Sequence, residues 1–238
     1  PVPTEDSGFT VNVDNLLANV TERTKIVMVA NPDNPTGTWL SDHEIRRLHA
    51  GLPPHVLLLL DSAYAEYVDD PAYSAPTALV DEHDNVVMTR TFSKIHGLAG
   101  LRLGWLYGPS AVIETLLKIG TTFPISNIAL ECGIAAMENT EYQREVRDRN
   151  KTLRSTLWEN MSSLGLKPLS SQTNFMLIEF PLSGPNAAGA AEALWARNIL
   201  VRRFPNLTFA NHIRVSIGTE NEMELFFAAM KDYVNGAC

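Results

Sequence analysis

Three short apolar segments, each the length of a strand and each followed by polar turn residues, constrain the fold of this chain most strongly. They comprise residues 24–30, 55–60 and 86–91. Their hydrophobic character is typical of parallel strands that are covered on both faces. Between the first two, Ser41 and Glu44 form a capping-box pattern that predicts the start of a helix. This alternation of strand, helix and strand predicts an α/β fold with a right-handed, mostly parallel sheet.

Each predicted strand is followed by a polar residue that could take part in binding or catalysis. Asn34, Asp61 and Lys94 come after the first, second and third strands, respectively. Ligands of open parallel sheets gather at the carboxyl ends of the strands, so we expect these three side chains to converge there. Lys94 lies in a turn of small residues that includes Gly97 and Gly100, where a ligand can approach the backbone closely. A lone lysine in such a turn can also be an ordinary surface residue.

Beyond Gly165, after a long helix expected at 141–164, the pattern changes to that of a smaller α+β domain. The long helix is expected to be amphipathic, and Thr219 with Glu222 repeats the capping-box pattern before a final helix. The expected elements between them are strands at 174–180, 199–202 and 213–217 and a helix at 186–197. We therefore predict two domains, 1–145 and 146–238.

The composition narrows the class of protein. The chain has 238 residues, 45% of them hydrophobic, which is enough for a substantial core, and its net charge of -8 argues against a nucleic-acid partner. No apolar run approaches the length of a membrane span, and no signal peptide is visible at Pro1. Cys132 and Cys238 lack the spacing of metal ligands, so no metal site is predicted and a reducing, cytoplasmic location is expected.

Three motifs occur in an informative order. They are N-P-T-G at residues 34–37, D-S-A-Y at 61–64, and S-K at 93–94 with Arg102 eight residues after the lysine. Together they resemble the fold-type-I pyridoxal-phosphate aminotransferases, and within them the histidinol-phosphate and aromatic branch. The resemblance runs from Pro1 to about Tyr233. It implies an aspartate-aminotransferase-like, three-layer large domain, which is partial here because family members carry a further N-terminal segment. It also implies a cis Asn34-Pro35 peptide bond.

The resemblance assigns the cofactor chemistry to four residues. Lys94 would hold the aldehyde of pyridoxal phosphate covalently and then move a proton between substrate and cofactor. Asp61 would stabilise the protonated ring nitrogen, because a carboxylate favours a neighbouring positive charge. Asn34 and Tyr64 would donate hydrogen bonds to the phenolate oxygen. Each also has a structural interpretation: Asp61 as a cap, Asn34 as a turn residue and Tyr64 as a core ring.

The same resemblance assigns the anionic groups. Thr91, Ser93 and Arg102 match the residues that bind the cofactor phosphate, for which an arginine fork is well suited. Arg214 matches the residue that binds the α-carboxylate of the substrate, although it could instead form a salt bridge. Arg202 matches the residue that helps to bind a substrate phosphate, although it could instead be solvated.

The activity implied by this resemblance is transamination. Histidinol phosphate with glutamate is the expected substrate pair, in histidine biosynthesis, and the protein is expected to be a homodimer. Alternatives are an aromatic or broad amino-acid aminotransferase, a decarboxylase of threonine phosphate, and a non-catalytic fragment or sensor domain. Arg90 and His96 flank the lysine, but neither the pattern nor the resemblance assigns them a role.

Overall fold

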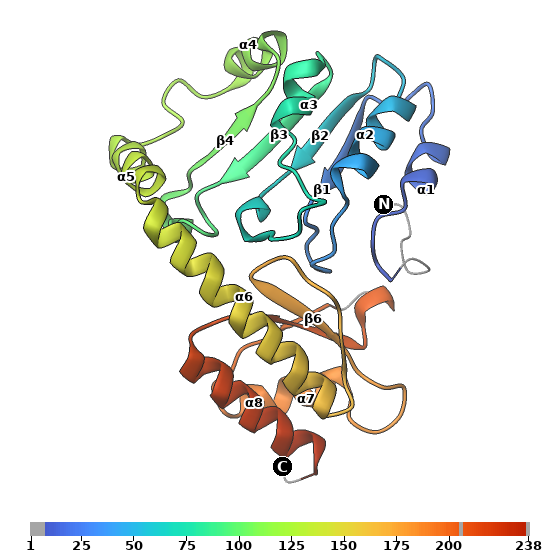
Figure 1. The fold of residues 1–238 in the computed structure, drawn as a ribbon, viewed down its shortest axis with the longest axis vertical. Helices are drawn as coiled ribbons and strands as arrows, with labels where there is room; N and C mark the ends of the chain where they lie inside the picture. Colours follow the sequence, from blue (N-terminus) through green and yellow to red (C-terminus); the bar gives the residue numbers. More distant parts are fainter. Residues whose placement is uncertain (1–7, 205–206, 237–238) are drawn as a thin grey trace. The chain divides into compact units, whose positions relative to one another are not determined.

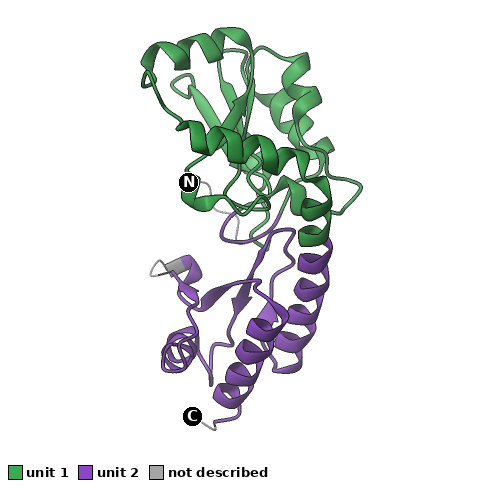
Figure 2. Cartoon of the chain, turned by 90° about the vertical axis from the view of Figure 1, so that its left-hand side faces the viewer, with its two compact units in different colours: residues 1–33, 39–147 green, residues 34–38, 148–238 purple. Residues whose placement is uncertain are grey.

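The computed structural model describes residues 8–204 and 207–236, so Pro1 and Cys238 lie outside the described residues. The chain divides into two compact units, which are coloured separately in Figure 2. Unit 1 comprises residues 1–33 and 39–147, and unit 2 comprises residues 34–38 and 148–238. The sequence predicts one boundary near residue 145 and does not predict that the segment 34–38 groups with unit 2.

The sheet of unit 1 has the predicted character. Its strands are β1 (Ile26–Ala30), β2 (Leu57–Asp61), β3 (Val86–Thr91) and β4 (Gly104–Tyr107), arranged in the order β1-β2-β3-β4 (Figure 1). The first three strands are parallel, and β4 runs antiparallel to β3. The prediction of an α/β fold with a mostly parallel sheet is therefore confirmed.

Unit 1 also contains helices. They are α1 (Val13–Ala18), α2 (Asp42–Gly51), α3 (Thr77–Glu82), α4 (Ser110–Ile119) and α5 (Asn127–Glu138), with short 3-10 helices η2 (Ala65–Tyr67) and η3 (Ala99–Leu101). As predicted, Ser41 caps α2 by accepting a hydrogen bond from the Glu44 backbone N–H. Side chains of α1, α2 and α3 share a buried core with β1, β2 and β3. This core anchors the strands whose carboxyl ends carry the predicted site residues.

Unit 2 is an antiparallel sheet with helices. Helix α6 (Thr140–Ser163) begins in unit 1 and continues into unit 2, where α7 (Ala187–Trp195), η4 (Leu207–Phe209) and α8 (Glu220–Val234) follow. The strands are β5 (Lys167–Pro168), β6 (Phe175–Glu179), β7 (Arg202–Arg203) and β8 (His212–Ser216), in the order β5-β6-β8-β7. Apolar side chains from α6, α7 and α8 pack on β6 and β8 to form a separate core.

The predicted strand at 199–202 is wrong in its extent. Only Arg202 and Arg203 pair with β8. Ile199 and Val201 are instead partly buried against the core of unit 2. Their hydrophobic character therefore reflects packing by a connecting segment, which has the same composition as a strand.

The segment 34–38 is held within unit 2 by backbone and side-chain contacts. The Asn34-Pro35 peptide bond is cis, as expected, and Asn31-Pro32 is cis as well. Gly37 adopts a φ of 77°, and a Cβ at this position would collide with the side chain of Ser171. Its carbonyl accepts a hydrogen bond from the Gln172 N–H at 3.0 Å. Only glycine satisfies both the backbone conformation and the close approach.

Among the described residues, no helix has the length and hydrophobicity that crossing a bilayer would require.

Candidate active site

The lysine turn begins where β3 ends. The Ser93 N–H donates to Thr91 Oγ1 at 3.0 Å, and the Gly97 N–H donates to the Lys94 carbonyl at 3.0 Å. Gly97 has a φ of 71°. These local hydrogen bonds make a tight turn with Lys94 near its centre, and the lysine is half-buried. The turn therefore presents an amine at the carboxyl end of a parallel strand, as the sequence predicts.

Tyr64 is the immediate neighbour of this amine. Lys94 Nζ lies 5.2 Å from the centroid of the Tyr64 ring, which is a cation–π distance. Tyr64 is only 5% exposed and comes three residues after the end of β2. The loops that follow β2 and β3 are therefore in contact through Tyr64 and Lys94.

Asp61 is the last residue of β2 and is half-buried. Its Oδ1 accepts a hydrogen bond from the Ala63 N–H at 3.2 Å. On the neighbouring strand, Asp61 is the register partner of Thr89, two residues before the end of β3. The carboxylate thus caps its own turn at the carboxyl end of β2, next to the end of β3 where the lysine turn begins. A carboxylate has further lone pairs beyond the one used by a cap, so the structural and chemical roles are compatible.

Thr91, Ser93 and Arg102 lie on the same loop as the lysine. The Thr91 hydroxyl accepts from Ser93, and a hydroxyl that accepts can still donate to another group. Arg102 is exposed, has a φ of 52°, and donates from Nη1 to the Ala99 carbonyl at 2.6 Å. Two hydroxyls and a guanidinium on one loop form a donor set that is suited to a phosphate.

Unit 2 brings together the other three predicted residues. Arg214 donates from Nη1 to Asn34 Oδ1 at 2.5 Å. Its guanidinium carbon lies 4.8 Å from the centroid of the Phe175 ring. Arg202 is the register partner of Arg214 across β7 and β8, so the two side chains share one face of the sheet. Two neighbouring guanidinium groups on one face favour an anion, because like charges directly opposite each other are otherwise destabilising.

The structure therefore places the nine predicted residues in two groups. Unit 1 holds Asp61, Tyr64, Thr91, Ser93, Lys94 and Arg102, and unit 2 holds Asn34, Arg202 and Arg214. The sequence analysis missed Phe175, which stacks on Arg214, and Glu66, which pairs with Arg90. For Glu66 a signal was present, since a glutamate two residues beyond D-S-A-Y is close in the chain to Tyr64.

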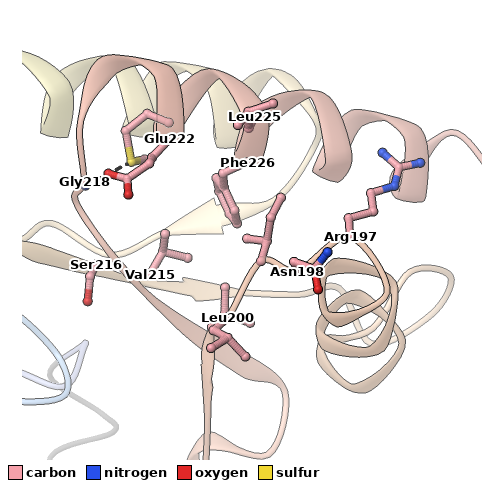
Figure 3. A pocket seen from close by; sticks show the side chains of 12 residues that line it. Arg197, Asn198, Leu200, Val215, Ser216, Gly218, Glu222, Leu225 and Phe226 are labelled. Carbon is pink, nitrogen blue, oxygen red and sulfur yellow. Dashed lines mark hydrogen bonds between the residues drawn. The ribbon is translucent and has the colours of Figure 1, made fainter.

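A pocket of about 490 Å³ lies in unit 2 between α8 and the segment that precedes β7 (Figure 3). Its lining includes Asn198, Leu200, Val215, Glu222 and Phe226. None of the nine predicted residues lines it, so this pocket is not the candidate active site. No group of His, Cys, Asp and Glu side chains suited to a metal ion occurs among residues 8–204 and 207–236.

A mostly parallel α/β sheet that carries an amine, a phenol and a carboxylate at the carboxyl ends of its strands is typical of α/β proteins that bind a ligand at those strand ends. Comparison with known proteins gives the family. The model of the aminotransferase class I and II family matches residues 1–230, and the chain belongs to this family.

Two curated relatives are similar to almost the whole chain. A histidinol-phosphate aminotransferase of Rhodospirillum centenum is 46% identical over 236 residues, which are 99% of this chain and 65% of the relative. One of Nitrobacter winogradskyi is 43% identical over 230 residues, which are 96% of this chain and 63% of the relative. The chain thus spans a little less than two thirds of the length of these relatives.

Solved structures agree with the fold. The histidinol-phosphate aminotransferase from Sinorhizobium meliloti, in complex with pyridoxal-5'-phosphate, superposes with a TM-score of 0.87 at 31% identity. The match covers 95% of this chain and 62% of that one. A putative histidinol-phosphate aminotransferase from Erwinia carotovora atroseptica gives a TM-score of 0.88 at 26% identity and covers 95% of this chain and 65% of that one.

Proposed function

We propose that this protein is a pyridoxal-phosphate-dependent aminotransferase that transfers an amino group between histidinol phosphate and the glutamate keto acid in histidine biosynthesis. The observation that carries the proposal is the contact between the half-buried Lys94 amine and the Tyr64 ring at the carboxyl ends of β2 and β3. The identity of 46% to a histidinol-phosphate aminotransferase supports the choice of substrate.

The family resemblance gives each group of pyridoxal phosphate a residue of matching chemistry. Lys94 would hold the aldehyde carbon, Asp61 the protonated ring nitrogen, and Tyr64 with Asn34 the phenolate oxygen. For the phosphate, hydroxyl and guanidinium donors are available on the lysine loop from Thr91, Ser93 and Arg102. When bound, the cofactor supplies an electron sink for the substrate carbon from which a proton is removed.

The residues of the chain would then perform three tasks. The Lys94 amine would act as the general base that takes a proton from the substrate carbon that bears the amino group. The positive charge of Arg214 would orient the substrate when it carries a carboxylate. Arg202, on the same sheet face, would bind a phosphate group, which favours a phosphorylated substrate over a purely aromatic one.

Mixing the purified full-length protein, loaded with pyridoxal phosphate, with one amino donor at a time tests this proposal. Absorbance reports the half-reaction, and we expect a spectral change with histidinol phosphate and with glutamate. Lys94→Ala should lower the rate at least about 1,000-fold, because it removes both the nucleophile and the general base. Lys118→Ala, which changes an exposed lysine on α4, is the matched control and should retain the rate.

Each outcome of this experiment has a distinct meaning. A spectral change with phenylalanine but none with histidinol phosphate would replace the proposed substrate with an aromatic amino acid. Full turnover by Lys94→Ala would refute the role of the lysine. The proposed homodimer rests on the family resemblance, and the proposed cytoplasmic location rests on the cysteine content of the chain.

A further inference from the structure

A cluster of three polar side chains, which we term the Glu66 cluster, lies beside the lysine turn and has no part in the proposed chemistry. It consists of Glu66 in η2, Arg90 near the end of β3, and His96 in the turn itself. Arg90 Nη2 donates to Glu66 Oε1 at 2.5 Å, and His96 Nε2 lies 3.9 Å from the same oxygen. A single carboxylate oxygen is thus the common partner of both basic groups.

The cluster is largely withdrawn from solvent. The side chains of Glu66, Arg90 and His96 are 17%, 14% and 5% exposed. The Arg90 guanidinium also lies 5.6 Å from the ring centroid of Trp105, its register partner on β4. An ion pair in such surroundings is costly to break, because the remaining partner is left as a poorly solvated charge.

His96 packs against this pair as a neutral ring. Its centroid is 4.9 Å from that of Phe92. Burial lowers the pKa of His96 below its ordinary value, and the positive charge of Arg90 acts in the same direction. Attraction to Glu66 and to the Ala136 carbonyl opposes this effect without reversing it. The negative charge of Glu66 is therefore balanced by Arg90.

Both residues of the ion pair are close in the chain to residues of the candidate active site. Glu66 comes two residues after Tyr64, and Arg90 comes four residues before Lys94. Because Tyr64 and Lys94 are themselves in contact, the ion pair and this contact close a small ring of interactions across the two loops. Loosening the pair would therefore let the two loops separate where the amine meets the phenol.

We propose that Glu66 and Arg90 are positioning residues, which hold Tyr64 and Lys94 at their working separation while His96 fills the remaining side of the pair. This inference rests on the proposed function for its catalytic meaning. Its structural content, that the ion pair orders the lysine turn, does not depend on the reaction.

The full-length protein allows a test with matched variants. Glu66→Gln and Arg90→Met each remove one charge, whereas Arg90→Lys retains it. Arg46→Met and Glu82→Gln alter the same residue types in an ion pair of 2.6 Å on the surface of unit 1, where the side chains are 38% and 50% exposed. Amide hydrogen exchange of residues 92–98 is measured without cofactor. The pH titration of the absorbance of bound pyridoxal phosphate and the values of kcat and KM are measured with it.

We expect Glu66→Gln and Arg90→Met to speed exchange in residues 92–98 about tenfold or more, because each leaves an unbalanced charge under the turn. We also expect them to shift the pH midpoint of the absorbance and to lower kcat about tenfold with little change in KM, because misplaced groups slow the chemical step. Arg90→Lys should recover most of each loss, and the surface variants should match the wild type.

The proposal is overturned if both cluster variants exchange and titrate like the surface variants, or if Arg90→Lys behaves like Arg90→Met. If Arg90→Met fails to fold, Glu66→Gln, which retains the size of the side chain but not its charge, decides the outcome. A wild-type protein that does not transaminate would refute the proposed function, yet the exchange measurement would still decide whether the ion pair orders the turn.

Discussion

His212 is the residue whose burial has the most direct consequence in solution. It is 5% exposed on β8, where its register partner on β6 is Glu179. Burial lowers the pKa of His212, the nearby Lys167 adds to this effect, and Glu179 opposes it. Near pH 6.5 the unfolded chain therefore binds a proton at this histidine more readily than the folded chain does. The free energy of unfolding must then decrease as the pH falls below about 6.5.

We predict that His212→Gln weakens this pH dependence. Urea unfolding at about pH 7.5 and about pH 5.5 should give midpoints that differ less in the variant than in the wild type, because glutamine does not titrate. His43→Gln, which alters a histidine with an 85% exposed side chain on α2, serves as the control and should keep the wild-type difference. Equal pH dependence in wild type and His212→Gln would contradict the prediction.

At the residue scale, some features of the candidate active site could be predicted from the sequence and others could not. The lysine turn was predictable, because small and polar residues at strand ends have a local signature, whereas Tyr64 was assigned by the family resemblance. The pairing of Arg202 with Arg214 and the hydrogen bond from Arg214 to Asn34 were not predictable. The pairing depends on strand register, the hydrogen bond joins residues 180 positions apart in the chain, and neither leaves a local pattern.

At the scale of elements, α8 has the most complete cap. The Thr219 side chain accepts from the Glu222 backbone N–H, and the Glu222 carboxylate accepts from the Thr219 backbone N–H at 2.7 Å. The predicted capping box is thus confirmed. Thr219→Ala should lower the free energy of unfolding by about 1 kcal/mol, as measured by urea denaturation, because it leaves a backbone donor without its acceptor.

The control for this prediction is Thr156→Ala in the interior of α6. Thr156 is exposed and donates only to the Thr152 carbonyl within the same helix, and alanine is the better helix former. The free energy of unfolding of the Thr156→Ala variant should stay the same or rise slightly. Equal losses in the two variants would show that the cap of α8 contributes nothing specific.

Element prediction succeeded where a single strong signal was present. The strands β1, β2 and β3 follow from continuous apolar runs, and α2 and α8 follow from their caps. The sequence analysis missed β5, Lys167–Pro168, because two residues that include a proline have no strand periodicity and are held only by pairing with β6. Short pairings of this kind are determined by the neighbouring strand rather than by their own sequence.

At the scale of the whole molecule, assembly is the property that can be measured most directly. We predict from the family resemblance that the full-length protein sediments as a homodimer, at twice the mass of its chain. Analytical ultracentrifugation across a range of concentrations, together with activity at each one, checks this. A monomer with full turnover would contradict it.

The proline turn at residues 34–38 has a final consequence, for dissection of the chain. It belongs to unit 2, although residues of unit 1 flank it on both sides. Within unit 2, the Gly37 carbonyl accepts a hydrogen bond from the Gln172 N–H, and Asn34 Oδ1 accepts one from the Arg214 guanidinium. A polypeptide cut within α6 and beginning at Asp148 would lack both partners. The C-terminal piece alone would therefore be an incomplete unit 2, and during synthesis the loop at 34–38 has to await partners that are made more than a hundred residues later.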